Sequence, residues 1–240
     1  MSVILPVRNA EAWIRDAVMT LLSQTYNRLE ILVVDNNSTD RSWEIVKSIE
    51  DDRIVQLHQP EGFLVSTLNK GLMYAKGLLI ARQDADDLSK STRIRAQVDL
   101  LREHEDIEIV GCSYHIISAD GVFIKTNQAY AAPSQVRKRL VNAMPFAGAS
   151  ILGSRFIFDA LHGYDTAFDG AVGEDYDFLV RAAELTNISA VDEPLYVYRT
   201  GNPLSMCGLI NYNYDAAKDL VRRRALARGS RFFLETEYEQ

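Results

Sequence analysis

Three carboxylates, Asp84, Asp86 and Asp87, follow a short apolar run at residues 78–83 that has the composition of a buried strand. In an extended chain, side chains two residues apart point the same way and lie roughly 7 Å apart. We therefore expect Asp84 and Asp86 to face one pocket and Asp87 to point away. Two carboxylates in one pocket repel each other unless a cation joins them, and oxygen ligands suit Mg²⁺ or Mn²⁺. The alternative interpretation is an acidic turn that begins the following helix.

A second polar segment, residues 35–40, follows another apolar run. The oxygen atoms of Asp35 and Asn36 can accept hydrogen bonds from a base or a ribose. The same residue types favour a strand-to-helix turn and a helix N-cap, so this segment alone leaves both interpretations open. Asn37 takes the second acidic position of the D-x-D pattern of aspartyl-phosphate phosphatases, which disfavours that class.

The turn after the first apolar run disfavours another class. Pro6, Val7, Arg8 and Asn9 stand where a dinucleotide-binding fold needs the glycines of G-x-G-x-x-G. A dehydrogenase of the Rossmann type is therefore not expected.

A third acidic group consists of Glu174, Asp175 and Asp177, and it follows a glycine-bearing segment at residues 163–173. Acidic residues in the first turn of a helix complement the helix dipole, which is a sufficient structural explanation for them. Carboxylates can also act as general bases, and these side chains are candidates for that role.

The elements that must position these groups alternate along the first 110 residues. Apolar runs at residues 2–7, 30–35, 54–59 and 78–83 predict strands, and helical spacing predicts helices at 11–24, after 39 or 40, at 64–75 and at 91–104. Asn9 is placed to cap the first helix. This alternation is typical of a parallel sheet built from βαβ units, which binds ligands at the carboxyl ends of its strands.

The second half of the chain has a mixed pattern. Residues 109–117 and 122–126 flank Asp120 and Gly121, which predicts a hairpin. Further on, the pattern predicts a short strand near 149–152, a helix from about Glu174, a strand near 195–199 and a helix at 214–228. No repeat or linker marks a second domain, so we expect one domain over residues 1–240.

Composition limits the class of protein. The 240 residues are 47% hydrophobic with a net charge of −7, so the chain can bury a full core and has no general attraction to nucleic acid. An acidic enzyme that binds an anionic substrate must concentrate positive charge locally, and a bound cation does this.

Cys112 and Cys207 have no metal or redox spacing, which predicts inert thiols in a reducing compartment. No apolar run approaches the length of a membrane span or a signal peptide, so a cytoplasmic location is expected.

Five short motifs, in this order, resemble those of family 2 inverting glycosyltransferases with the GT-A fold. They are VILPVRNA at residues 3–10, SQTY at 23–26, VDNNSTD at 34–40, DADD at 84–87 and EDYD at 174–177. The resemblance spans about residues 2–199 and implies an α/β fold with a Rossmann-like, mostly parallel central sheet flanked by helices. It also implies a nucleotide-sugar-binding half at 1–110, a mixed acceptor-binding half at 111–205 and a C-terminal helical tail at 206–240.

The resemblance further implies roles for individual residues. The nucleoside base would be held by Pro6, Val7, Arg8, Asp35 and Asn36. Asp84 would lie near the ribose, and Asp86 would bind Mn²⁺ or Mg²⁺ on the diphosphate, with Arg82 or Arg199 helping to neutralise the leaving group. Asp175 would be the catalytic base, with Glu174 and Asp177 as alternatives.

The chain departs from the family pattern at two places. Asn36 stands where the family often has Asp, which leaves the choice among uridine, thymidine and guanosine donors open. No His follows Tyr198 and Arg199 near Gly201, so a third protein ligand for the metal is not expected there.

The expected activity is inverting transfer of a sugar from a nucleoside diphosphate sugar to an acceptor hydroxyl. A uridine diphosphate sugar is the expected donor, a saccharide or lipid-linked saccharide is the expected acceptor, and synthesis of bacterial cell-surface polysaccharide or glycolipid is the expected setting. One alternative is a sugar nucleotidyltransferase, although residues 8–11 are not the glycine-rich basic loop that it would need. A non-catalytic nucleotide-sugar-binding protein is the other alternative.

The last predicted helix carries a cluster of cations, Arg222, Arg223, Arg224 and Arg228. Cations complement the dipole at the end of a solvated helix. A second hypothesis is that they hold the protein peripherally at the inner, anionic face of a membrane, near a lipid-linked acceptor.

Overall fold

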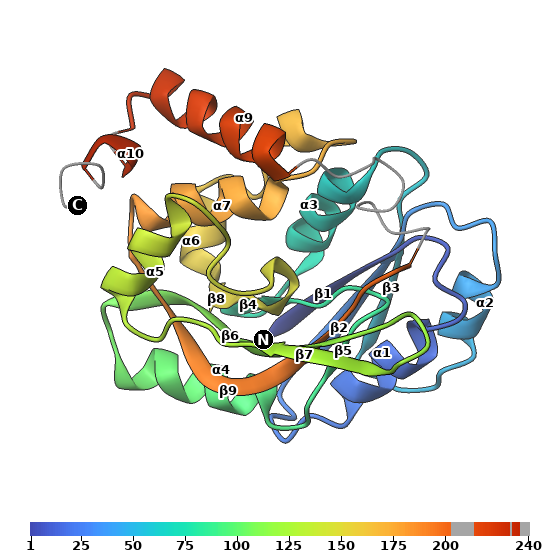
Figure 1. The fold of residues 1–240 in the computed structure, drawn as a ribbon. Helices are drawn as coiled ribbons and strands as arrows, with labels where there is room; N and C mark the ends of the chain where they lie inside the picture. Colours follow the sequence, from blue (N-terminus) through green and yellow to red (C-terminus); the bar gives the residue numbers. More distant parts are fainter. Residues whose placement is uncertain (203–213, 231, 236–240) are drawn as a thin grey trace.

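The computed structural model describes residues 1–202, 214–230 and 232–235, and Figure 1 shows their arrangement. A nine-stranded sheet runs through both halves of the chain in the order β3-β2-β1-β4-β8-β6-β9-β5, with β7 paired to β6. The strands are β1 (Ser2–Val7), β2 (Glu30–Asp35), β3 (Ile54–His58), β4 (Leu79–Arg82), β5 (Leu88–Ser89), β6 (Ile107–Ile117), β7 (Phe123–Asn127), β8 (Leu152–Ser154) and β9 (Asn187–Arg199).

The sheet combines a parallel part with a mixed part. Strand β1 lies between β2 and β4 and is parallel to both, and β3 is parallel to β2. Strand β8 is antiparallel to β4 and to β6, while β6 and β9 form a long parallel pair. The predicted fold class, mostly parallel with a mixed second half, is therefore confirmed, and so is the β6–β7 hairpin.

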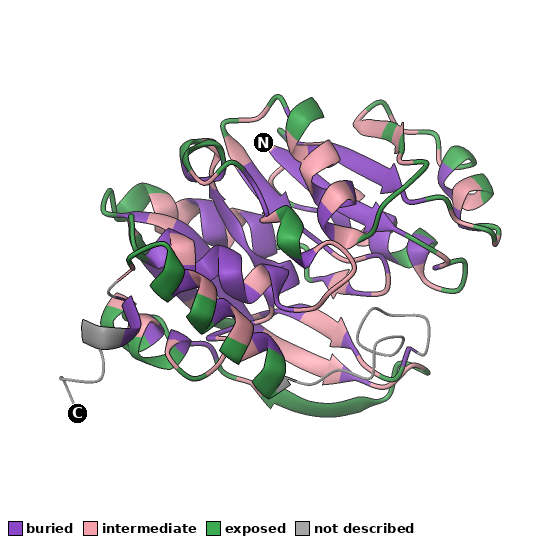
Figure 2. Ribbon diagram, turned by 90° about the horizontal axis from the view of Figure 1, so that it is seen from above, coloured by how far each residue is buried: buried purple, intermediate pink, exposed green. Residues whose placement is uncertain are grey.

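Helices cover both faces of the parallel strands because those strands are apolar on both sides. On one face, Val3 and Leu5 of β1 share a buried cluster with α1 (Ile14–Leu22), α2 (Ser42–Lys47) and α4 (Arg93–Glu103). On the other face, Ile4 packs with α3 (Leu64–Tyr74), α6 (Arg155–Ala160) and α7 (Glu174–Ala183). Figure 2 shows the resulting layer of buried strands beneath helices whose outer faces are exposed.

Several elements were not predicted. They are β5, α5 (Pro133–Leu140), α6, two short 3₁₀ turns, η1 (Gly148–Ser150) and η2 (Thr166–Phe168), and α10 (Phe232–Glu235). These elements are short, and α5 buries only Val136 and Leu140, so none carries enough apolar periodicity to be recognised locally.

The predicted capping role of Asn9 is wrong. Helix α1 begins at Ile14, and no side chain caps its N-terminus. Asn9 instead adopts a positive φ of 50°, and its side-chain oxygen accepts the Thr39 N–H at 2.8 Å. Asn tolerates this conformation better than most residues, so Asn9 joins the turns that follow β1 and β2.

Two predicted strand boundaries also differ from the structure. Strand β9 begins at Asn187, not near 195, because a register shift opposite Cys112 and Ser113 lets Pro194 lie within the strand. Strand β8 occupies residues 152–154, since Gly148–Ser150 forms a 3₁₀ turn where the strand was expected to begin.

The described residues contain no helix that combines the length and apolarity required to cross a bilayer. Cys112 is fully buried, and burial raises the pKa of its thiol to about 11, as expected for an inert thiol. Cys207 lies outside the described residues.

Candidate functional site

A cavity of about 570 Å³ opens at the carboxyl ends of β1, β2 and β4. The cavity is lined by nearly all of the site residues that the sequence predicts, namely Pro6, Val7, Arg8, Asn36, Arg82, Asp84, Asp86 and Asp175, together with Glu174 and Arg199. Segments distant in sequence therefore meet in one crevice, as parallel strands ending at one edge require.

Asp84 and Asp86 reach the cavity by a route that differs from the predicted one. Strand β4 ends at Arg82, and residues 84–87 form a turn in which the Asp87 N–H donates to the Asp84 carbonyl at 3.3 Å. Asp84 and Asp86 line one cavity, as predicted, but the predicted reason, alternation along an extended strand, is wrong. Asp87 does not line the cavity, as predicted, but it is buried.

Arg82 links the two acidic groups of the site. Its guanidinium donates to the Asp84 carboxylate at 2.8 and 3.1 Å and to Glu174 Oε1 at 3.1 Å. Burial lowers the pKa of Arg82, but the charges of Asp84 and Glu174 outweigh burial and raise the pKa well above its ordinary value. Arg82 therefore stays charged and joins the end of β4 to the start of α7.

The first turn of α7 presents Glu174 and Asp175 to the cavity. Gly173 precedes them with a φ of 105°, a conformation that favours glycine. Asp175 packs against Gly148, where an added Cβ would lie 2.0 Å from Asp175 Oδ2, so a glycine at 148 makes room for this carboxylate. Asp175 Oδ1 accepts the N–H of Tyr176 at 2.8 Å.

The carboxylates of α7 differ in environment. Burial raises the pKa of Asp175, and burial together with the charge of Asp175 raises the pKa of Glu174 to about 7. Asp177 is fully buried, pairs with Arg181 and Arg228, and does not line the cavity. Asp177 therefore has no surface in the cavity, which disfavours it as an alternative proton acceptor.

Asp86 is the residue best placed to bind a divalent cation. Its Oδ2 accepts the side-chain N–H of Asn202 at 2.8 Å, and burial, with the charge of Asp84, raises its pKa. The described residues contain no cluster of three or more His, Cys, Asp or Glu side chains suited to a metal. Mg²⁺ and similar ions are commonly held by one or two carboxylates plus substrate phosphates, so a site with Asp86 as its protein anchor fits this chemistry.

Asp35 does not line the cavity, in contrast to the prediction, whereas Asn36 does. Asp35 is 2% exposed, and its Oδ2 accepts from the Ser38 N–H at 3.4 Å and lies 3.2 Å from His58 Nδ1. Its Oδ1 is buried and has no hydrogen-bond partner among the described residues. A buried acceptor without a donor is costly, and this one lies in the residue that immediately precedes Asn36 of the cavity lining.

Sequence reasoning missed the apolar and aromatic wall of the cavity. Phe63, Leu64 and Thr67 come from the start of α3, and Tyr114, Ile116, Met144, Phe146 and Tyr198 come mainly from β6, β9 and the segment before η1. Arg8 lies 6.0 Å from the centre of the Phe63 ring, and Tyr114 and Tyr198 meet edge to face at 6.3 Å. These residues carry no local motif, because side chains of the same kinds also fill ordinary cores.

The arrangement matches a known family. The sequence model for "Glycosyl transferase family 2" matches residues 2–161, the part of the chain that holds β1 to β4 and the acidic turn. The chain belongs to glycosyltransferase family 2. Among similar curated proteins, the O-antigen biosynthesis glycosyltransferase WbnJ of Escherichia coli is 28% identical over 99% of this chain and 94% of its own length.

Other relatives of the family 2 chain are longer. The alignment with an uncharacterized glycosyltransferase of Rickettsia conorii covers 81% of this chain and 32% of that relative, at 28% identity. The alignment with the uncharacterized glycosyltransferase EpsJ of Bacillus subtilis covers 86% of this chain and 62% of that relative, at 29% identity.

Solved structures establish the GT-A fold. The structure of S. aureus TarS residues 1–349 in complex with UDP-GlcNAc superimposes with a TM-score of 0.72 at 18% identity, covering 98% of this chain and 70% of the chain in that structure. The mannosyltransferase PcManGT of Pyrobaculum calidifontis, in complex with GDP-Man and Mn²⁺, gives a TM-score of 0.63 at 22% identity, covering 84% and 57% of the two chains.

Proposed function

We propose that this chain transfers a sugar, with inversion, from a nucleoside diphosphate sugar to an acceptor hydroxyl, and that the donor is a uridine diphosphate sugar. The observation that carries the proposal is the single cavity that Asp84 and Asp86 share with Glu174 and Asp175. One acidic pair suits the donor and its cation, and the other suits the acceptor. The name of WbnJ supports a role in surface polysaccharide or glycolipid synthesis, and the TarS complex supports a uridine nucleotide.

Inversion at the anomeric carbon requires the acceptor oxygen to approach opposite the leaving diphosphate. In the proposed reaction Asp175 accepts the proton of the acceptor hydroxyl, and Glu174 is the alternative acceptor. Asp175 is suited to this role because it is only partly exposed, lines the cavity and has a raised pKa. Arg82 joins the donor-side carboxylate Asp84 to the acceptor-side carboxylate Glu174 through its two ion pairs.

A divalent cation, Mn²⁺ or Mg²⁺, would be held by Asp86. When bound there, it would supply charge neutralisation for the diphosphate leaving group. Arg199 was the other candidate for this task. Its guanidinium donates to the backbone carbonyls of Asp86 at 2.9 Å and Ala119 at 2.9 Å, so we assign it to holding the turn that carries Asp86.

Calorimetry tests the donor and cation assignment together. Uridine diphosphate is titrated into the protein with Mn²⁺, then with EDTA, and the series is repeated for guanosine diphosphate and for Asp86→Ala. We expect affinity to fall at least tenfold in EDTA, the Asp86→Ala variant to behave like wild type in EDTA, and uridine diphosphate to bind more tightly than guanosine diphosphate. Equal affinity with and without the cation would reject the metal assignment.

Donor hydrolysis separates a transferase from a non-catalytic binding protein. Slow release of uridine diphosphate from its sugar conjugate, without acceptor, is expected for the transferase. Binding without any release would favour the non-catalytic alternative.

We further propose that residues 1–110 bind the donor and residues 111–205 bind the acceptor, with the protein in the cytoplasm. The hypothesis of peripheral membrane contact is weakened, because two of the four arginines on which it depends form ion pairs within the protein: Arg224 with Asp165 and Arg228 with Asp177. Co-sedimentation with anionic and neutral vesicles at low salt tests what remains of it, and equal binding to both would end the hypothesis.

A further inference from the structure

Helix α9 (Tyr214–Ala227) lies against the helix that carries the proposed base. Ala217, Val221 and Ala225 recur on one side of α9 at helical spacing and are all buried. Val221 and Ala225 belong to the same apolar cluster as Phe178 of α7. The apolar face of α9 therefore docks it onto α7.

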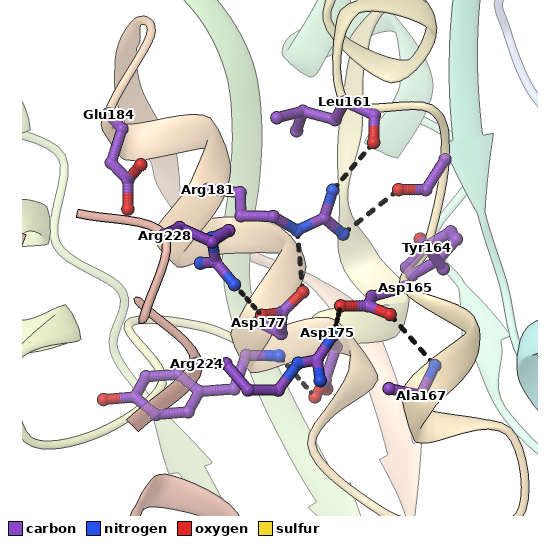
Figure 3. A network of polar contacts seen from close by, with 12 residues as sticks. Leu161, Tyr164, Asp165, Ala167, Asp175, Asp177, Arg181, Glu184, Arg224 and Arg228 are labelled. Atoms are coloured by element: carbon purple, nitrogen blue, oxygen red, sulfur yellow. Dashed lines mark hydrogen bonds and ion pairs between the residues drawn. The ribbon is translucent and has the colours of Figure 1, made fainter. Parts of the chain in front are cut away.

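Arg228, which directly follows α9, reaches a carboxylate on α7. Figure 3 shows Arg181 and Arg228 converging on Asp177, two residues after Asp175. Asp177 Oδ2 accepts from Arg181 Nε at 2.7 Å, and Oδ1 accepts from Arg228 at 3.4 Å. Arg181 also donates to the carbonyls of Leu161 and Gly163, at 2.9 and 3.1 Å. Asp177 is fully buried, so its charge must be paired, and Arg228 is its second cationic partner beside Arg181.

Arg224 reaches the segment before α7. It pairs with Asp165, whose carboxylate also accepts the Ala167 N–H at 2.9 Å and caps η2. The Arg224 guanidinium lies 5.8 Å from the centre of the Phe168 ring. Arg224 therefore holds η2 while Arg228 holds α7.

Gly173, the N-cap of α7, lies in sequence between Asp165 and Asp177, the partners of Arg224 and Arg228. A Cβ added at Gly173 would lie 3.2 Å from the Cβ of Ala217 and 3.4 Å from the Phe168 ring. Residues of α9 and η2 thus lie beside the residue that immediately precedes Glu174 and Asp175 and leave little space around it. A displacement of α9 would reach the proposed base through this contact.

We propose that Arg224 and Arg228, the α9 arginine pair, are positioning residues for sugar transfer: they hold the first turn of α7 so that Asp175 faces the acceptor. Neither residue lines the cavity, so they act through Asp165 and Asp177. The inference rests on the proposed function for its catalytic consequence. The positional effect on α7 does not depend on that function.

The kinetic test compares Arg224→Ala, Arg228→Ala and their double variant with Arg223→Ala. Arg223 is a matched control, because it lies on the same helix and forms an ion pair with Asp219 of α9 itself. Uridine diphosphate release from its sugar conjugate is measured at a temperature where every variant is folded. We expect the double variant to lose about tenfold or more in kcat, since small displacements of catalytic groups are costly, with the donor Kd unchanged within twofold.

Two further measurements distinguish positioning from general stabilisation. Arg224→Lys with Arg228→Lys should recover at least half of the lost kcat, because each Lys restores the charge. Hydrogen exchange should accelerate in the double alanine variant at the Asp177 amide, which donates to the Gly173 carbonyl at 2.9 Å, and not in α1.

The proposal is overturned if kcat of the double alanine variant stays within twofold of that of Arg223→Ala, or if exchange at Asp177 is unchanged. It is also overturned if exchange accelerates equally in α1, which would indicate a purely global loss of stability. If the wild type releases no uridine diphosphate, the proposed function fails, and the exchange measurement alone decides whether the arginine pair positions α7.

Discussion

At the scale of single residues, Glu174 and Asp175 are neighbours with different surroundings. Glu174 faces the Arg82 guanidinium at 3.1 Å, whereas Asp175 accepts a backbone N–H and occupies the space left by Gly148. Pairs of carboxyl groups held in unlike environments are typical of sites that divide tasks between them. We assign the structural ion pair to Glu174 and the proton transfer to Asp175 on this basis.

The Asp175→Asn variant tests this assignment. Asn keeps the size and most hydrogen bonds of Asp but cannot take a proton, so transfer should fall by about 10² to 10⁴ while donor affinity stays nearly unchanged. The cost in stability should be at most about 1 kcal/mol, because Asn and Asp are similar at a helix start. Transfer rate, donor Kd and melting temperature are measured together. A variant that retains more than about a tenth of wild-type turnover would move the role to Glu174.

At the scale of elements, the acidic turn at residues 84–87 depends on strand β9. Asp87 Oδ2 accepts the Tyr196 hydroxyl at 2.6 Å, and Oδ1 accepts the Arg199 N–H at 2.7 Å. The Asp84 N–H donates to the same Tyr196 hydroxyl at 3.3 Å. The third carboxylate of the motif therefore anchors the turn, while the other two face the cavity.

The Asp87→Ala substitution should mainly lower the free energy of unfolding and should weaken donor binding only as a secondary effect. It leaves the buried Tyr196 hydroxyl and the Arg199 N–H without their acceptor, which costs about 1–3 kcal/mol for each group. Because Asp87 does not line the cavity, Asp87→Ala should weaken donor binding less than Asp86→Ala does. Urea unfolding measures the loss, with Asp52→Ala at an exposed position as the control. A loss below about 0.5 kcal/mol would show that Asp87 does not anchor the turn.

At the scale of the whole molecule, the site concentrates negative charge in a protein that is already acidic. The chain has a net charge of −7, and Asp84, Asp86, Glu174 and Asp175 all line one cavity. Burial and mutual repulsion raise the pKa of Asp86, Glu174 and Asp175. A cluster of this kind lowers the stability of the folded state and prepares it for a cationic ligand.

The stability of the fold should therefore depend on pH through Glu174. Its pKa is raised from 4.5 to about 7, so between these values the folded protein binds more protons than the unfolded chain. Stability from this group is present at low pH and is lost as pH rises through about 7. Glu174→Gln removes the titration, so the variant should gain stability relative to wild type between pH 5 and pH 8.

Urea unfolding at pH 5, 6, 7 and 8 measures this difference, with Glu61→Gln at an exposed position as the control. A difference between wild type and Glu174→Gln that stays constant with pH would show that Glu174 does not titrate in this range. A difference that moves in the opposite direction would show that its ion pair with Arg82 outweighs burial.

Local sequence patterns were sufficient to predict the main elements and the polar residues at their ends. Apolar runs and helical spacing identified the parallel strands, and the polar residues that follow β1, β2 and β4 identified the crevice, because strand ends of a parallel sheet meet at one edge. These signals are local, since each depends on neighbours within a few residues. Short elements such as α5 and η1 gave no comparable signal.

The surroundings of the individual site residues depend on packing between distant segments. Arg82 pairs with Glu174 across 92 residues, Asp35 does not line the cavity, and Asp177 is buried in ion pairs and does not line it either. Acidic residues in one helical turn look alike in sequence. Their roles diverge because α7 packs with one side against the cavity and the other against α9, and this packing depends on contacts between distant segments that no local pattern records.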